Sequence, residues 1–425
     1  MQYNPTLHKL SNGVTVILDP MDLETTNVKV HFRTGARDEK PGEQGLTHFC
    51  EHMVCKGTPR FPTQKIYDEY LDNYGGTRNA STSMSSFRFY GRVLAENVNV
   101  LIDFLGDQIQ NPLFLPEKIE IERKAISDEL RRASDDPGDQ LAGFTSQKLF
   151  NGVTGSGVRI LGSLENINIF TREQMLEFLA RRLSAKNCII GISGKINDAD
   201  GVLSCLEKTF SFLPAINVLE NTDIEYTPAI AHNSQMDKNN VKLRIYFPDI
   251  WPDTFENIFN NTCANKFGRF MIDELYEVVR RDTGLAYGFG RAGVGNEKFG
   301  VSGFATQTSA ENIEKCVALI AKTAHKIYTE NAITDEDLAR YCRKNKLGNA
   351  DWMESAGGRC DKLIGFYRDY GRVYDAFDAV RMSESIRRDD VIKNSRGGFD
   401  GPMSIITQGA DYATDLKAVW EENFK

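Results

Sequence analysis

The stretch from Gly45 to Pro59 constrains the chain more than any other, because it contains the pattern His-x-x-Glu-His. If this stretch is helical, His48 and His52 are about one turn apart and Glu51 follows His48 by three residues, so the three side chains share one face. The pattern is the zinc-binding His-Glu-x-x-His signature in reverse order. The sequence therefore predicts a helix that presents two imidazoles and a carboxylate to one metal ion.

The residue types of this pattern suit a catalytic zinc site. Two neutral imidazoles can bind zinc at about 2.0–2.1 Å while a neighbouring carboxylate takes a proton from water. Such a site usually has three protein ligands, so a third must come from elsewhere in the chain. With 6 His and 59 acidic residues in 425, chance is expected to give about 0.01 copies of the pattern even when Asp is allowed in place of Glu. Two hydrogen-bonded core histidines on an amphipathic helix are the alternative interpretation.

The composition is that of an ordinary water-soluble globular protein, and the length suggests two domains or more. No apolar run approaches the roughly 18 residues of a membrane span, and the first residues resemble neither a signal peptide nor an Arg-rich transit peptide. A net charge of −8 argues against a general nucleic-acid-binding protein. The eight scattered cysteines favour free thiols in a reducing compartment, which predicts a cytoplasmic or, alternatively, a mitochondrial-matrix location.

The first half of the chain begins with β-rich runs. Residues 13–18 and 28–33 are predicted to form a β-hairpin, with His31 as a sheet histidine rather than a ligand. The Ser/Thr-rich strand 77–82 has little to bury, which suggests an edge strand to which an extended peptide could add. An exposed hairpin without a partner is an equally good interpretation of that strand. Cys50 lies two residues after His48, which turns it to another helix face and predicts a buried apolar role.

Two helices follow, at residues 96–110 and from Pro116 to Leu130, each with apolar residues at the helical period. On the second helix, Glu122 and Glu129 are two turns apart and share a face with apolar residues. Carboxylates on such a face are costly to bury unless they are paired or bound to a metal. Either of them could therefore be the missing ligand.

The second half of the chain repeats this plan, with strands at 241–247 and 300–306 around a helix at 264–281. Ala-Glu-Asn-Ile at residues 310–313 then opens a helix as Ala-Glu-Asn-Val at residues 95–98 does in the first half. A repeat of this length indicates two related domains. Only the first copy contains His-x-x-Glu-His.

We therefore expect an α+β protein whose two domains each have a mostly antiparallel sheet packed with helices. The expected boundaries are 1–215 for the metal-binding domain, 216–235 for a linker and 236–425 for the second domain. The linker is assigned to a polar stretch without clear periodicity.

These segments resemble the pitrilysin, insulysin and mitochondrial processing peptidase family of inverted-motif zinc metallopeptidases, over nearly the whole chain. The resemblance rests on the repeat, the Glu122-Arg123 helix and four short segments: Gly45-Leu46-Thr47-His48-Phe49-Cys50-Glu51-His52-Met53, Lys56-Gly57-Thr58, Gly75-Gly76-x-x-Asn79-Ala80 and Arg280-x-x-x-Gly284-Leu285-Ala286-Tyr287. In this family the third ligand lies on a later helix, seven residues after another glutamate. Glu129 and Glu122 match that pattern.

The resemblance implies that His48, His52 and Glu129 bind zinc, that Glu51 is the general base that activates a water at the metal, and that Glu122 supports the ligands. It implies a zinc-dependent endopeptidase that acts on unfolded peptides or oligopeptides. A processing peptidase that makes one specific cut is one alternative. A non-catalytic scaffold or partner subunit of the same fold is another.

The resemblance also implies substrate-binding residues and an assembly. Arg280 and Tyr287 resemble the family's substrate clamp, which could hold a peptide carbonyl and stabilise an oxyanion. Gly284 is expected to end the helix after Arg280, so that Tyr287 starts a strand. Asn79 and Ala80 are expected on the strand that pairs with the substrate backbone. The short family members imply a homodimer or a heterodimer with a homologous chain, without membrane or nucleic-acid partners.

Overall fold

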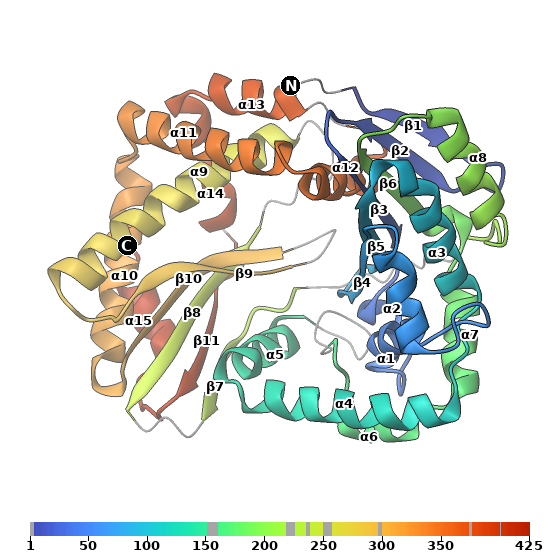
Figure 1. The fold of residues 1–425 in the computed structure, drawn as a ribbon. Helices are drawn as coiled ribbons and strands as arrows, with labels where there is room; N and C mark the ends of the chain where they lie inside the picture. Colours follow the sequence, from blue (N-terminus) through green and yellow to red (C-terminus); the bar gives the residue numbers. More distant parts are fainter. Residues whose placement is uncertain are drawn as a thin grey trace. The chain divides into compact units, whose positions relative to one another are not determined.

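The structure is a computed structural model, and it describes residues 4–150, 160–217, 226–234, 239–249, 257–295, 300–373, 376–399 and 401–425. The chain forms two compact units, each built from one sheet and its helices (Figure 1). Unit 1 contains residues 1–136, 153–223 and 348–376, and unit 2 contains residues 137–152, 224–347 and 377–425. The predicted α+β fold with two related domains is confirmed.

The sheet of unit 1 has six strands in the order β1-β2-β6-β3-β5-β4. They are β1 (Thr6–Lys9), β2 (Thr15–Pro20), β3 (Thr25–Phe32), β4 (Thr77–Thr82), β5 (Phe87–Leu94) and β6 (Cys188–Gly194). The described strands pair antiparallel, except that β2 and β6 are parallel. The predicted β2–β3 hairpin is wrong, because β6 lies between these strands. β6 is buried over its whole length, as expected of a strand with neighbours on both sides.

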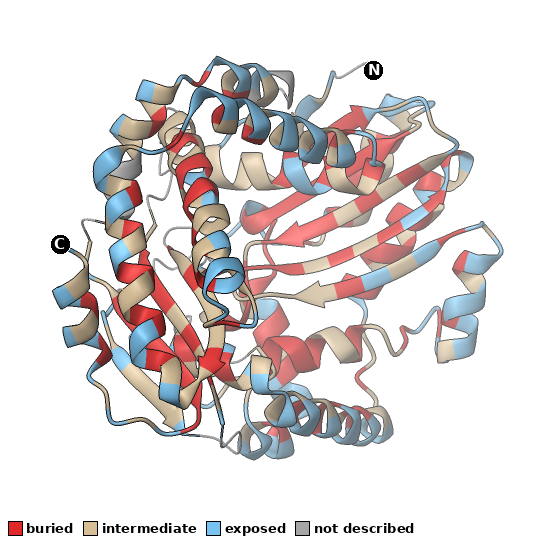
Figure 2. Cartoon of the chain, turned by 90° about the vertical axis from the view of Figure 1, so that its left-hand side faces the viewer, coloured by how far each residue is buried: buried red, intermediate tan, exposed pale blue. Residues whose placement is uncertain are grey.

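Helices from the first half of the chain cover one face of this sheet. They are α1 (Leu46–Val54), α2 (Gln64–Asp72), α3 (Val98–Gln110) after the 3₁₀ turn η2 (Ala95–Asn97), α4 (Pro116–Asp135), α6 (Leu164–Ile169), α7 (Arg172–Arg182) and α8 (Ala199–Phe210). Their apolar stripes and alternate strand residues form the main core of unit 1. Figure 2 shows the result, with strands buried over long stretches and helices buried mainly along one side. His31 is a buried residue of β3, as predicted.

The opposite face of the same sheet is covered by α12 (Ala356–Tyr370), which comes from the second half of the chain. A small apolar cluster joins helix and sheet, formed by Ile17, Ile189, Cys360, Leu363 and Ile364. Arg359 of α12 also forms a fully buried ion pair with Asp19 of β2, in which Nε donates to Oδ2 at 2.7 Å. A helix distant in sequence is thus fixed to unit 1 by both apolar and charged contacts.

The sheet of unit 2 has five strands in the order β7-β11-β8-β10-β9. They are β7 (Ile230–Ser234), β8 (Asn240–Pro248), β9 (Phe289–Gly295), β10 (Gly300–Ser309) and β11 (Ser404–Gly409). Its helices are α9 (Asn257–Tyr276) with the π-helical turn η4 (Glu277–Asp282), α10 (Ile313–Glu330) after η5 (Ala310–Asn312), α11 (Asp335–Met353), α13 (Ala376–Ser385), α14 (Arg388–Phe399) and α15 (Leu416–Asn423). A second core forms between these helices and the sheet.

The units are not the two contiguous halves that we expected. α5 (Pro137–Leu149) packs in unit 2, where Leu141 and Leu149 share an apolar cluster with Tyr246 and Ile406. Conversely, α12 comes from the second half of the chain and packs in unit 1. Each sheet has two apolar faces, and the second face is covered by a helix from the other half of the chain.

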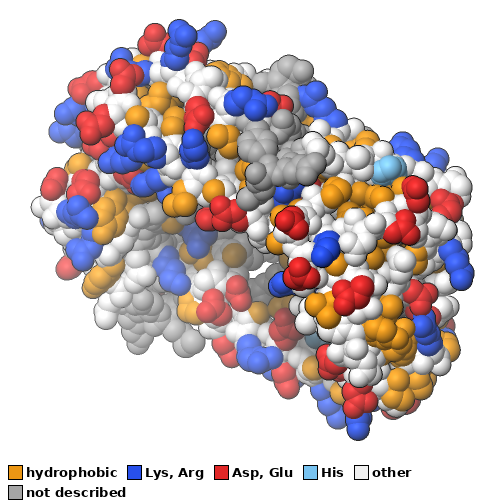
Figure 3. Space-filling model, turned by 45° about the horizontal axis from the view of Figure 1, so that its top comes forward, with side chains coloured by type: hydrophobic (Ala, Val, Ile, Leu, Met, Phe, Trp, Pro, Cys, Tyr) orange, Lys and Arg blue, Asp and Glu red, His pale blue; other side chains and the backbone are white. Residues whose placement is uncertain are grey.

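The expected linker 216–235 also contains a strand, because β7 pairs in parallel with β11. Residues 218–225 and 235 of that expected linker lie outside the described residues. Among the helices that the structure describes, none has the length and apolar character needed to cross a bilayer. On the face shown in Figure 3, Lys and Arg side chains are interspersed with Asp and Glu side chains.

Candidate metal centre

α1 carries the His-x-x-Glu-His pattern and is held against the core of unit 1 by one side. Leu46, Phe49, Cys50 and Met53 are buried in that core. This packing orients the helix so that the His48, Glu51 and His52 side chains lie away from the deepest part of the core. Cys50 is a packed apolar residue, as predicted, and burial raises the pKa of its thiol.

The start of α1 is fixed by Glu39, a buried residue with an exposed fraction of 2%. Its carboxylate accepts hydrogen bonds from the N–H groups of Gly45 at 2.9 Å and Thr47 at 2.7 Å. Gly45 itself, with a φ of +96°, provides no side-chain cap. Glu39 thus satisfies N–H groups that the first turn of a helix leaves free. Sequence reasoning missed Glu39 because it lies six residues before Gly45, outside the usual cap spacing.

Glu129, on α4, meets the two histidines of α1. Its Oε2 atom lies 3.9 Å from Nε2 of His48 and 3.7 Å from Nε2 of His52. Three donors bound tetrahedrally at 2.0–2.1 Å would lie roughly 3.4 Å apart, so a small inward adjustment of this set would accommodate zinc. Within the described part of the chain, this is the one cluster of His, Cys, Asp and Glu side chains with the spacing of a metal site. Of the two glutamates left open by the helical spacing, Glu129 is the one beside both histidines.

Both His48 and His52 have a ring nitrogen whose lone pair could bind a metal ion. Burial, with a contribution from His52, lowers the pKa of His48 to about 4, so this ring is neutral at neutral pH. Nδ1 of His52 hydrogen-bonds Oε2 of Glu122 at 2.9 Å, which leaves Nε2 to face Glu129. Lys56 Nζ lies 2.9 Å from the other oxygen of Glu122. Burial alone would raise the pKa of Glu122, but the bonds from His52 and Lys56 hold it below its usual value.

Lys56 is a second residue that sequence reasoning missed in this role. It follows His52 by four residues, so a helical reading already places it near the same face. Only the fold shows that its ammonium reaches Glu122.

Glu51 lies beside the cluster and near Thr82, the last residue of β4. Burial raises the pKa of Glu51, and the neighbouring Thr82 and His52 partly offset that rise. A carboxylate with a raised pKa is a better proton acceptor near neutral pH than an ordinary glutamate. The position and the pKa therefore suit Glu51 for proton transfer.

β4, which carries Asn79 and Ala80, lies at the edge of the sheet with β5 as its neighbour. The edge position agrees with the prediction from its Ser/Thr-rich sequence. Asn79 is exposed, and its Oδ1 accepts the N–H of the buried Ala80 at 2.9 Å. An added strand that used this N–H would have to displace the Asn79 amide.

Arg280 and Tyr287 belong to unit 2 and are both exposed, Tyr287 by 74%. The helix ends in η4 at Asp282, and Gly284 has a φ of +63°. β9 begins at Phe289, so the prediction that Tyr287 starts the strand is wrong by two residues. The Tyr287 N–H still donates to the carbonyl of Gln307 on β10 at 3.1 Å. The clamping role of these two side chains stays a prediction.

Comparison with known proteins matches both halves of the chain. Residues 15–154 match the family model described as Insulinase (Peptidase family M16), and residues 170–345 match the model described as Peptidase M16 inactive domain. The chain belongs to peptidase family M16. The first match spans the residues of the metal cluster, and the second spans Arg280 and Tyr287.

Relatives of this M16 chain include an uncharacterized zinc protease of Rickettsia felis, 27% identical over 98% of the chain and 100% of the relative. The mitochondrial-processing peptidase subunit beta of Dictyostelium discoideum is 33% identical over 47% of the chain and 42% of that protein. Among solved structures, a protease from Helicobacter pylori has a TM-score of 0.78 at 17% identity, covering 96% of this chain and 100% of the other. At that identity the structural likeness supports the fold alone.

Proposed function

We propose that this M16 chain is a zinc-dependent endopeptidase that hydrolyses peptide bonds in unfolded peptides or oligopeptides. The observation that carries the proposal is the meeting of His48, His52 and Glu129 beside Glu51 in the folded chain. The two Nε2 atoms and Oε2 of Glu129 would hold the ion. The names of the relatives, several of which are called zinc proteases, support the same class.

When bound, zinc supplies a Lewis acid that polarises a peptide carbonyl and acidifies water. Glu51 takes the proton from the attacking water and later gives it to the leaving amine. Glu122 holds the ring of His52 in the tautomer that leaves Nε2 free, and Lys56 keeps Glu122 ionised.

The substrate class is proposed from the edge strand β4. An extended peptide that adds to this edge is held mainly through backbone hydrogen bonds, which select for unfolded segments more than for sequence. Asn79 and Ala80 are proposed to make these bonds. Arg280 and Tyr287 are proposed to bind the substrate carbonyl. The proposed assembly is a dimer, either of identical chains or with a homologous chain.

A second candidate is a processing peptidase that makes one specific cut. The 33% identity to a mitochondrial-processing peptidase subunit beta favours it. Cleavage of several unrelated peptides by the purified protein separates the two functions. One cleaved peptide among many would indicate the processing enzyme, and broad cleavage would indicate an oligopeptidase.

Glu51→Gln tests the proposal, with peptidase activity on a mixed pool of unfolded peptides and bound zinc measured in parallel. We expect activity to fall by about 10²–10⁴-fold while zinc stays stoichiometric, because the variant loses only proton transfer. Glu120→Gln, an exposed position on α4, is the control and should keep full activity. Wild-type protein that holds zinc yet cleaves no peptide would contradict the proposal and favour a non-catalytic partner subunit.

A further inference from the structure

Lys266 on α9 is the one lysine among the described residues that is buried, with an exposed fraction of 2%. Its Nζ atom lies 3.3 Å from Sγ of Cys342 on α11 and 3.1 Å from Oγ of Ser383 on α13. No carboxylate of the described residues lies within ion-pair distance of this ammonium. A buried cation without a counter-charge is costly, so its two polar partners are its main compensation.

Cys342 is placed between a donor and an acceptor. Its sulfur accepts the Lys266 N–H, and its own S–H donates to the backbone carbonyl of Ser383 at 3.2 Å. Cys342 is half-buried, whereas five other cysteines are buried: Cys50, Cys188, Cys263, Cys316 and Cys360. Burial raises the pKa of each of those five thiols, which makes them poor nucleophiles. Cys342 differs from them in both exposure and partner.

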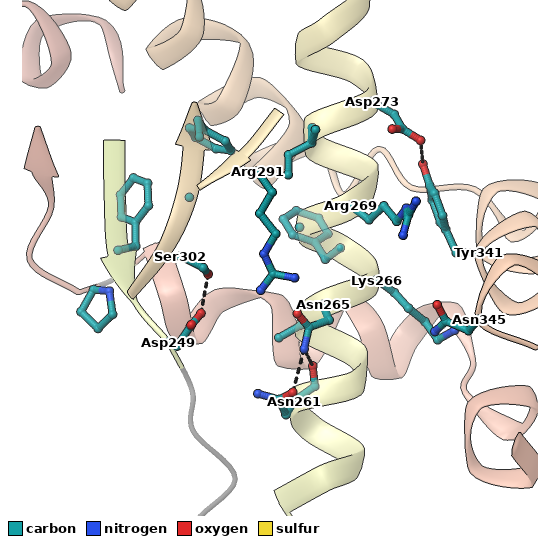
Figure 4. A pocket seen from close by; sticks show the side chains of 18 residues that line it. Asp249, Asn261, Asn265, Lys266, Arg269, Asp273, Arg291, Ser302, Tyr341 and Asn345 are labelled. Atoms are coloured by element: carbon teal, nitrogen blue, oxygen red, sulfur yellow. Dashed lines mark hydrogen bonds between the residues drawn. The ribbon is translucent and has the colours of Figure 1, made fainter. Parts of the chain in front are cut away.

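The lysine side of this pair borders a cavity of about 490 Å³ in unit 2. Arg269, Asp273, Tyr341 and Asn345 are among its other lining residues. Figure 4 shows the Lys266 side chain extending away from α9 toward Asn345 of α11, on the side opposite Arg291. The Lys266 ammonium therefore contacts the Cys342 thiol and does not point into the middle of the cavity. The cavity is large enough to hold a small solute such as hydrogen peroxide beside Lys266, and the Cys342 thiol is itself half-buried rather than enclosed.

We propose that Cys342 is a site of reversible oxidation by peroxide and that Lys266 promotes the step. The sulfur attacks one peroxide oxygen, an S–O bond forms and the O–O bond breaks. The thiol proton joins the departing hydroxide as water, so that Cys–SH and H₂O₂ give Cys–SOH and H₂O. Sulfur loses two electrons and the peroxide gains them. The Lys266 ammonium is positioned to hydrogen-bond the departing oxygen and then the new sulfenic oxygen. This site is independent of the proposed peptidase function.

The chain offers a comparison thiol in Cys205 on α8. It is half-buried like Cys342 and lies 3.8 Å from the carbonyl of Asn99, but no described lysine nitrogen hydrogen-bonds it. Burial raises the pKa of the Cys205 thiol, so the assignment to Lys266 depends on comparing Cys342 labelling in the wild type and in Lys266→Met. If Lys266 promotes the step, Cys342 oxidises faster in the wild type.

The test treats the reduced full-length protein with hydrogen peroxide in the presence of dimedone and measures labelling of each cysteine by mass spectrometry. We expect Cys342 to label at least about tenfold faster than Cys205. Lys266→Met should remove about that tenfold advantage and leave Cys205 unchanged. Ser383→Ala keeps the lysine, the thiol and the carbonyl, and should leave Cys342 labelling within about twofold.

Equal labelling of Cys342 and Cys205 in the wild type would overturn the proposal, and this comparison needs no variant to fold. Unchanged Cys342 labelling in a folded Lys266→Met protein would overturn the role of Lys266.

Discussion

The helix pair α1 and α4 of unit 1 has a counterpart in α9 and α11 of unit 2, between equivalent strands of the two sheets. Buried positions of the two first helices share one spacing: Leu46, Cys50, Met53 and Val54 on α1, and Cys263, Phe267, Phe270 and Met271 on α9. In that register, the positions of His48, Glu51 and His52 are occupied on α9 by Asn265, Gly268 and Arg269.

A polar link between the two helices is kept in both units, in a changed form. In unit 1, Lys56 and Glu122 are 2.9 Å apart. In unit 2, Asp273 takes the place of Lys56 in the same register, and Tyr341 takes that of Glu122 when α4 and α11 are aligned at their first residues, Pro116 and Asp335. The Tyr341 hydroxyl donates to Asp273 at 2.8 Å. The α9–α11 pair therefore forms without the His48, Glu51 and His52 side chains of α1, and a cationic Arg269 cannot ligate a metal. The difference teaches that the candidate metal site is a set of side chains placed on a helix pair that also forms without them.

The largest expected difference between the two helix pairs concerns metal binding. His52→Ala should abolish stoichiometric zinc and lower peptidase activity by more than about 100-fold, beyond the usual loss for a residue that only supports a ligand. Arg269→Ala, at the corresponding position, should leave both unchanged. Zinc content and peptide cleavage measured on the two purified variants check this. Loss of zinc in Arg269→Ala would break the correspondence.

The local features of this comparison could be predicted from the sequence. The reversed motif and the edge strand at residues 77–82 are visible in short windows, because each depends on spacing within one element. The repeat is visible when residues 95–98 are compared with residues 310–313. The third ligand was open on spacing alone. The family resemblance pointed to Glu129, and the fold places Glu129 beside both histidines.

The long-range features could not be predicted in this way. β6 is an apolar run whose sequence does not show which strands it separates. α5 and α12 have ordinary amphipathic patterns that do not reveal which sheet they cover. Glu39 and Lys56 are single charged residues, and their contacts exist only once the chain has brought their partners close. The spacing of apolar residues shows which face of a helix or strand is buried. It does not show which strands pair or which sheet a helix covers, because these depend on the whole fold.

The second prediction compares the two exchanged helices. Arg359→Met removes the partner of the buried Asp19, so the free energy of unfolding should fall by about 3–5 kcal/mol. In unit 2, α5 is linked to β11 by a neutral bond from Gln408 to the carbonyl of Pro137 at 2.8 Å. Gln408→Ala should cost about 1 kcal/mol. Urea unfolding of both variants measures the difference.

A double variant sharpens this result. Asp19→Leu combined with Arg359→Met removes both charges and should recover much of the stability lost in Arg359→Met alone, because the uncompensated buried carboxylate is gone. Equal losses in the single and double variants would show that packing of the arginine, rather than the ion pair, fixes α12.

The third prediction concerns the link between the helices of each pair. Glu122→Gln should weaken zinc binding by about 10–100-fold, because the amide supports the ring of His52 less well than a carboxylate. Tyr341→Phe should leave zinc affinity unchanged and reduce unfolding free energy by about 1 kcal/mol. Zinc titration against a competing chelator measures the affinities. If both variants weakened zinc binding, the two links would not be independent of each other.

The smallest expected effect compares β3 with β8, where His31 and Tyr246 take the same place in the two sheets. Burial, with nearby arginines, lowers the pKa of His31 from 6.5 to about 3. Below pH 6.5 the unfolded chain therefore binds a proton that the folded chain does not, and unfolding free energy falls as pH falls. The loss from this group should be roughly 1 kcal/mol at pH 5.5.

His31→Gln should remove that part of the pH dependence, and Tyr246→Phe should not change it, because neither a tyrosine nor a phenylalanine gains a proton in this range. Urea unfolding at pH 7.5 and pH 5.5 gives the required differences for the wild type and both variants. The wild type should lose more stability than His31→Gln between these two pH values. Equal losses would mean that the buried ring is already protonated in the folded sheet, with the nearby arginines tolerating its charge.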